Sequence, residues 1–199
     1  MNDFPIETHP FAPVLPPRAR VMMMGTFPPA AAKRCMAFHY PNFQNDMWRI
    51  YGLVFFNDAG YFQVAGEKRF DAGKIRDFLM AHNIALCPTV RRAVRERGNA
   101  SDKFLRIVEP VDLGAVLAQL PDCRWLFTTG GKATETLLSL LEPAPPMPPV
   151  NQAVAFDYHG RHLQLCRLPS SSRAYPLALA AKAAAYRAFF ERSGVLPLS

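Results

Sequence analysis

Short apolar segments that end in loops rich in glycine, proline or serine are the feature that most constrains this fold. Residues 20–24 are too few for a buried helix and predict a buried strand. Similar segments occur at 84–87, 124–128 and 163–167, with a further strand at 154–158; helical patterns lie at about 46–55, 73–82, 111–120, 132–141 and 176–192. Buried strands that alternate with helices predict an α/β protein whose parallel sheet carries helices on both faces.

The composition is that of a globular protein. Half of the 199 residues are hydrophobic and 20% are charged, and no apolar stretch reaches the roughly 18 residues that a membrane span needs. We expect one domain over residues 20–199, preceded by a Pro-rich leader over 1–19 and interrupted by a Pro-rich insertion over 142–150. Acidic residues stand where a signal peptide would be basic, so we expect a cytoplasmic protein without membrane contact.

The cysteines are too widely separated to indicate a metal site. Cys35, Cys87, Cys123 and Cys166 are 52, 36 and 43 residues apart, and no CxxC pair occurs. This spacing is unlike that of zinc or iron–sulfur sites. We therefore expect four reduced thiols, no bound metal and no cofactor.

Positive charge is concentrated in two segments. Residues 91–106 hold six basic side chains against two acidic ones, and residues 161–192 hold six against one. If the two segments lie on one face, they would form the footprint expected for binding a phosphate backbone. The alternative is a pair of solvated helix faces.

Four of the predicted strands end in loops of unusual composition, at residues 25–29, 87–92, 128–132 and 168–173. The carboxyl ends of parallel strands meet at one edge of a sheet, and ligands of open α/β sheets bind there. These loops together are therefore the candidate functional site.

The loop after the first strand suits a nucleobase. Gly25, Thr26 and Phe27 place a glycine, a hydroxyl group and an aromatic ring directly after the strand. The ring could stack on a base while backbone N–H groups bind its edge. The spacing is not that of a P-loop, and a simple tight turn is the alternative interpretation.

Two later loops offer donors and positive charge. Thr128, two glycines and Lys132 open a helix whose backbone amides could bind an anion, although such glycines often do no more than end a strand. The loop 170–173 supplies three serine hydroxyl groups and a guanidinium, which could contact successive phosphates and enter a duplex. Taken alone, it fits an N-cap region equally well. The G-x-S-x-G motif of serine nucleophiles is absent.

The nine residues from Tyr40 to Trp48 gather aromatic, amide and carboxylate side chains. Asn45 is a natural N-cap for the helix that follows, and Asn45 or Asn42 could position a water molecule. Asp46 could act as a base, or it could stabilise the positive end of the helix. For Trp48, core packing is the favoured interpretation.

In order and spacing, these motifs resemble the uracil-DNA glycosylase superfamily, most closely its hypoxanthine-DNA glycosylase branch. The resemblance spans about residues 21–192 and rests on residues 25–29, an aromatic–Tyr–Pro loop followed by 45–48, 84–86 with 98–102, 127–133 and 168–172. It implies a three-layer α/β/α sandwich around a central four-stranded, mainly parallel sheet, and no metal.

The resemblance also implies hydrolysis of the bond between a deaminated base, uracil or hypoxanthine, and deoxyribose, which starts base excision repair. Such an enzyme needs a flipped base, a positioned water and no bulk solvent. An asparagine is no strong base, so it would orient the water. We assign catalysis to Asn45 and Asp46, base binding to Gly25, Thr26, Phe27, Tyr40, Trp48 and Thr128, and DNA binding to Lys132, Ser170, Ser171, Ser172 and Arg173.

Two positions depart from the superfamily pattern. The first motif lacks the carboxylate or amide that many members use to activate water, and Cys87-Pro88 replaces an aromatic–Asp pair. Two other classes of function therefore stay open: a non-catalytic nucleic-acid-binding protein and a hydrolase of free nucleosides. The preferred base, the strand preference and the oligomeric state are also open.

Overall fold

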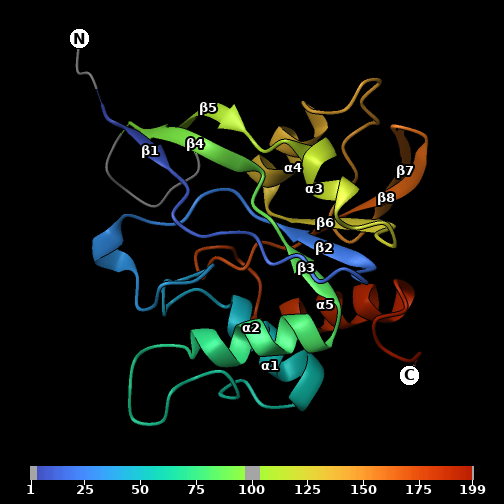
Figure 1. The fold of residues 1–199 in the computed structure, drawn as a ribbon. Coiled ribbons are helices and arrows are strands. Elements are labelled where there is room, and N and C mark those ends of the chain that lie inside the picture. Colours follow the sequence, from blue (N-terminus) through green and yellow to red (C-terminus); the bar gives the residue numbers. More distant parts are fainter. Residues whose placement is uncertain (1–3, 97–103, 199) are drawn as a thin grey trace.

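The computed structural model describes residues 4–96 and 104–198 (Figure 1). Strands and helices alternate along much of the chain. In chain order the elements are β1 (Ile6–Thr8), β2 (Val21–Met24), the short 3-10 helix η1 (Ala31–Lys33), α1 (Met47–Phe56), α2 (Ala72–Ala81), β3 (Ile84–Leu86), β4 (Val90–Arg95), β5 (Leu105–Pro110), α3 (Leu113–Ala118), β6 (Trp125–Thr129), α4 (Gly131–Leu138), β7 (Ala153–Tyr158), β8 (Arg161–Leu168) and α5 (Leu179–Arg192).

The central sheet has five strands in the order β3-β2-β6-β8-β7. The first four run parallel, with Met23 of β2 opposite Leu86 of β3 and Phe127 of β6. The predicted α/β sandwich with a mainly parallel sheet is confirmed, but the sheet has a fifth strand. The segment expected to form a strand at 154–158 is β7, which folds back antiparallel on β8 through a hairpin and extends the edge of the sheet.

Helices cover both faces of this sheet. Figure 1 shows α1, α2 and α5 on one face and α3 and α4 on the other. Val21 and Met23 pack into the first layer, whereas Met22 and Met24 pack into the second. All four side chains are fully buried, which explains why β2 is a continuous apolar run without polar alternation.

The starts of three helices follow from local chemistry. The side chain of Asp71 accepts a hydrogen bond from the backbone N–H of Lys74 at the start of α2, and Asp112 accepts one from Ala115 at the start of α3, both at 2.9 Å. Gly130, which precedes α4, has a φ of +114°, a value that favours glycine. α4 thus begins directly at the carboxyl edge of the sheet.

A second, antiparallel sheet of order β1-β4-β5 lies beside the first. The segment predicted as a loop at 87–92 becomes a strand from Val90, where β4 begins. Residues 6–8, in the segment predicted as a leader, pair with β4, with Ile6 opposite Val94. Residues 98–102, which carry part of the resemblance, lie outside the described residues. In the ranges that the structure describes, no helix is long and apolar enough to span a membrane.

Candidate active site

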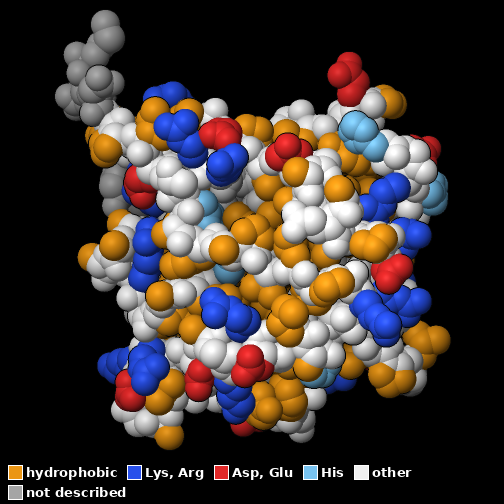
Figure 2. All heavy atoms as spheres, viewed as in Figure 1, with side chains coloured by type: hydrophobic (Ala, Val, Ile, Leu, Met, Phe, Trp, Pro, Cys, Tyr) orange, Lys and Arg blue, Asp and Glu red, His pale blue; other side chains and the backbone are white. Residues whose placement is uncertain are grey.

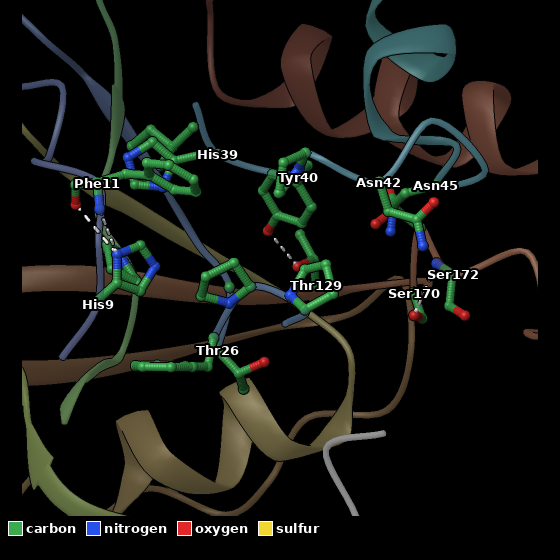
Figure 3. Close-up of a pocket in the computed structure, with 18 of the residues that line it drawn as sticks. His9, Phe11, Thr26, His39, Tyr40, Asn42, Asn45, Thr129, Ser170 and Ser172 are labelled. Atoms are coloured by element: carbon green, nitrogen blue, oxygen red, sulfur yellow. Dashed lines mark hydrogen bonds between the residues drawn. The ribbon is translucent and has the colours of Figure 1, made fainter. Parts of the chain in front are cut away.

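A cavity of about 470 Å³ opens at the carboxyl ends of the parallel strands. Its walls combine the loop 25–29 after β2, Pro88 after β3, Thr129 at the end of β6, the loop 170–172 after β8 and Asn45 ahead of α1. Figure 3 shows side chains from these segments converging on the cavity. The four loops that the sequence places at one sheet edge therefore do line one site.

A hydrogen bond between Tyr40 and Thr129 shapes this cavity. The hydroxyl oxygens of the two side chains are 2.7 Å apart (Figure 3). The Tyr40 hydroxyl also lies so close to Gly25 that a Cβ atom there would come within 2.5 Å of it. Gly25 therefore contributes by leaving room for the tyrosine.

Asn45 lines the cavity two residues before α1, whose N-cap is Asp46 and not Asn45 as the sequence predicts. Its Oδ1 accepts a hydrogen bond from the backbone N–H of Met47 at 2.9 Å, which anchors the side chain at the helix start. Its NH₂ group has no hydrogen-bond partner among the described residues, and Oδ1 keeps a second lone pair. Asn42 and Ser172 lie beside it (Figure 3). The carboxamide is thus fixed in orientation and able to bind a ligand or a water molecule.

Asp46 does not line the cavity but connects the segments behind it. Its Oδ2 accepts a hydrogen bond from Nζ of Lys182 at 2.9 Å, and the two side chains are only 9% and 1% exposed. Lys182 also donates to the carbonyl of Ser172 at 2.8 Å, and the Asp46 backbone N–H donates to the carbonyl of Ser171 at 2.9 Å. This ion pair therefore holds the loop after β8 against the start of α1.

The serine loop presents hydroxyl groups to the cavity. Ser170, Ser171 and Ser172 all line it. The hydroxyl oxygens of Ser170 and Ser172 accept hydrogen bonds from backbone N–H groups two residues later, at 3.2 and 3.3 Å, so their O–H groups remain available as donors. The side chain of Arg173 is 56% exposed and lies 3.7 Å from the Asp46 carboxylate. The loop thus combines small donors with a nearby guanidinium.

The N-terminal segment forms a further wall that the sequence did not indicate. His9 and Phe11 line the cavity together with Phe27 and His39. The His9 ring stacks on His39 with centroids 5.3 Å apart and meets Phe27 edge to face at 5.3 Å. Burial is the main cause that lowers the pKa of both histidines to about 4. The wall is therefore uncharged at neutral pH.

Two residues predicted to bind a base lie outside the cavity wall. Trp48 is fully buried in the core, and its Nε1 donates to the carbonyl of His39 at 3.0 Å. Thr128 is also fully buried, with its hydroxyl 2.8 Å from that of Thr134. Successive residues of a strand point to opposite faces, so Thr129 reaches the cavity instead. Strand alternation in the sequence shows that Thr128 and Thr129 face opposite ways, but not which of them faces the cavity.

Lys132 lies in a neighbouring hollow of about 390 Å³, which shares Ser170 with the first cavity. Arg167 and Gly131 also line this hollow, which opens at the start of α4. Lys132 is therefore placed beside the candidate site, on the side of the serine loop.

Several arginine side chains form ion pairs or hydrogen bonds with other groups of the protein. Arg91 lies 3.2 Å from the carboxylate of Glu109, while Arg161 and Arg187 donate to backbone carbonyls at the ends of α3 and α1. Figure 2 shows Lys and Arg side chains dispersed over one face, with acidic groups among them. On that face the basic side chains do not form a continuous track. Residues 97–103 of the first basic segment lie outside the described ranges.

Three of the four cysteines, Cys87, Cys123 and Cys166, are buried free thiols. Burial raises the pKa of Cys87 to about 12 and that of Cys123 to about 11. Within the part of the chain that the structure describes, no group of three or more His, Cys, Asp or Glu side chains could hold a metal ion.

Comparison with known proteins places the fold. The sequence matches no family model and no curated protein. The structure is similar to the solution NMR structure of a Methanosarcina acetivorans protein described as a "putative Uracil DNA glycosylase", with a TM-score of 0.65, 20% sequence identity, and coverage of 95% of this chain and 99% of that chain. At this identity the likeness establishes a shared fold. The chain is therefore an α/β protein that shares the fold of that protein.

Proposed function

We propose that this protein is a monofunctional DNA glycosylase that hydrolyses the N-glycosidic bond of deaminated bases in DNA, uracil or hypoxanthine, and so starts base excision repair. The observation that carries the proposal is the convergence of Thr26, Phe27, Asn45 and Ser171 on one cavity. The fold shared with the Methanosarcina acetivorans protein supports it. The resemblance of residues 45–48 to the hypoxanthine branch favours Asn45 as the catalytic group.

In the proposed reaction the target nucleotide leaves the duplex and its base enters the cavity. Phe27 and Tyr40 offer rings against which the base can lie. Cleavage places positive charge on the sugar and negative charge on the departing base, so fixed donors around the base lower the barrier. The Asn45 carboxamide, anchored by the Met47 N–H, orients the attacking water. We assign Asp46 a positioning role, because its carboxylate is bound to Lys182.

The DNA backbone would cross the serine loop. Ser170, Ser171 and Ser172 offer hydroxyl donors for phosphate oxygens, and Arg173 offers an exposed guanidinium. Lys132, in the hollow next to Ser170, would meet a neighbouring phosphate. The bound phosphates would in turn stabilise the cationic sugar.

The test is a cleavage assay on duplexes that contain one deoxyuridine or one deoxyinosine, followed by alkali to break the abasic site. The wild-type protein should give product from at least one lesion, and Asn45→Ala should reduce the rate by about 100-fold or more. Because Asn45→Ala also removes a contact at the start of α1, Asn45→Ser serves as a second variant. A serine hydroxyl can keep the hydrogen bond from the Met47 N–H two residues later but cannot replace the carboxamide.

A non-catalytic nucleic-acid-binding protein is the second candidate. It is favoured by one observation: among the described residues, no carboxylate lines the cavity. The same duplexes distinguish the two functions. Salt-dependent binding without product, unchanged by Asn45→Ala, would reject the glycosylase proposal in favour of binding alone.

A further inference from the structure

The His9 ring has one nitrogen held by the backbone and one directed at the cavity. Its Nδ1 lies 3.1 Å from the carbonyl oxygen of Phe11. The opposite edge of the ring, which carries Nε2, faces the interior of the cavity (Figure 3). In the described part of the chain Nε2 has no hydrogen-bond partner. A polar atom at this place in a pocket wall is available to a ligand.

The rings around His9 hold it in this orientation. His39 stacks on one side, Phe27 meets it edge to face, and Phe11 packs at 5.8 Å between ring centroids. The Nε2 of His39 is occupied, because it lies 2.9 Å from the carbonyl of Ala12. Of the two imidazoles in this wall, His9 is therefore the one that can contact a ligand through Nε2.

The tautomer of His9 sets what Nε2 can bind. Nδ1 lies 3.1 Å from the carbonyl oxygen of Phe11 and 3.3 Å from the backbone nitrogen of the same residue, so a neutral ring either donates to the carbonyl or accepts from the N–H. The contact to the carbonyl is the shorter one, and the tautomer that makes it carries its proton on Nδ1 and leaves Nε2 as a hydrogen-bond acceptor. The lowered pKa keeps the ring neutral at pH 7, so this acceptor is not lost by protonation.

Deamination changes the group that a base offers to such an acceptor. The pairing edges of cytosine and adenine each carry an unprotonated ring nitrogen, whereas uracil and hypoxanthine carry a ring N–H in the same place. An acceptor fixed opposite that position binds the N–H and repels the lone pair. With cytosine or adenine in the cavity, the acceptor and the ring nitrogen would both be buried without a hydrogen bond, and the cost of leaving them unpaired disfavours these bases.

We propose that Nε2 of His9 accepts a hydrogen bond from the ring N–H of the extruded deaminated base, which makes His9 a specificity-determining residue. This inference rests on the proposed glycosylase function and identifies a group that separates uracil from cytosine and hypoxanthine from adenine. It also gives residues 6–11 a role in the site: pairing of β1 with β4 carries His9 to the cavity.

The direct test is NMR of the protein labelled with ¹⁵N-histidine. In the free protein at pH 7, His9 should be the tautomer with the proton on Nδ1. Uracil added as the free base should shift the Nε2 resonance of His9, whereas 3-methyluracil, which lacks the N–H, should leave it in place. The opposite tautomer, or equal shifts with both bases, would overturn the inference. This readout requires no catalysis, so it separates failure of the inference from failure of the glycosylase proposal.

The kinetic test uses variants of His9 on duplexes that contain deoxyuridine. His9→Phe keeps the ring contacts but removes the acceptor and should slow excision by about tenfold, the effect of one lost hydrogen bond. His9→Gln places an amide oxygen near the position of Nε2 and should restore part of the rate. His162→Phe, on the exposed β7–β8 hairpin, is the matched control and should leave the rate unchanged. Equal rates for wild type and His9→Phe would contradict the proposal.

Discussion

At the scale of single residues, close approach and burial decide what the side chains of the site can do. Gly25 is the clearest case, since any side chain there would displace the Tyr40 hydroxyl from Thr129. A glycine after a strand is visible in the sequence, but its partner fifteen residues later is not. The sequence therefore indicates a turn at Gly25, while the structure shows that the turn also makes room for a ring.

The two histidines of the wall predict a dependence of stability on pH. In the unfolded chain each has a pKa near 6.5, and in the folded protein burial lowers it to about 4. Between these values the unfolded chain binds more protons, so the free energy of unfolding should decrease as the pH falls from about 6.5 towards 4. Each histidine contributes up to about 1.4 kcal/mol per pH unit in this window. Urea unfolding followed across the window measures the slope.

Replacement of both histidines is the control for this pH dependence. The double variant His9→Phe, His39→Phe keeps aromatic rings in the wall and should flatten the slope between pH 6.5 and 4.5. A slope that persists in the double variant would show that other groups cause it. Above pH 7 the two histidines should contribute no pH dependence.

At the scale of elements, one buried ion pair joins α5, α1 and the serine loop. Lys182→Met should destabilise the protein by about 3–5 kcal/mol, because it leaves the Asp46 carboxylate buried without its ammonium partner. It should also lower the rate of base excision, since the loop 170–172 loses its contact with Lys182. Thermal or urea unfolding measures the first effect, and the duplex assay measures the second.

A second variant separates the charge of this pair from its packing. Asp46→Asn combined with Lys182→Met removes both charges and should recover a large part of the lost stability. If the double variant is as unstable as Lys182→Met alone, the ion pair is not the cause. From the sequence, Asp46 can be interpreted only as a base or as a charge near the start of a helix. Its partner Lys182 lies 136 residues away, and no pattern around Asp46 indicates it.

Element boundaries show the same limit. The strand β2 and the helices α1 and α2 lie close to where apolar runs predict them, although the N-cap of α1 is Asp46 and not the predicted Asn45. The sequence predicts a loop over residues 87–92, because polar arginines hide the strand pattern of β4, which begins at Val90. It becomes a strand by pairing with β1 on one side and β5 on the other, contacts that no short window of sequence contains.

At the scale of the whole molecule, the net charge of +7 overstates the charge available to DNA. Arg91, Arg161, Arg187 and Lys182 are held by carboxylates or carbonyls of the protein itself. Lys132, Arg167 and Arg173 lie near the candidate site. With about three such contacts, log K for DNA binding should fall with log salt concentration at a slope of about −3.

Fluorescence anisotropy with the Asn45→Ala variant and a uracil-containing duplex measures this slope without cleavage. A slope near −7 would show that the arginines held in internal contacts also bind the DNA backbone. Lys132→Gln should reduce the slope by about one unit, with little effect on the preference for the lesion.

The sequence by itself determined the alternation of buried strands with helices and the loops that follow the parallel strands. Those features depend on short-range patterns: apolar runs, turn residues and helix caps. Only the tertiary structure decided that Thr129 replaces Thr128, that Trp48 lies in the core, that Asp46 is tied to Lys182, and that His9 reaches the cavity. Each of these depends on which side of a strand faces the site or on contacts between distant segments, and such contacts form only when the sheets assemble.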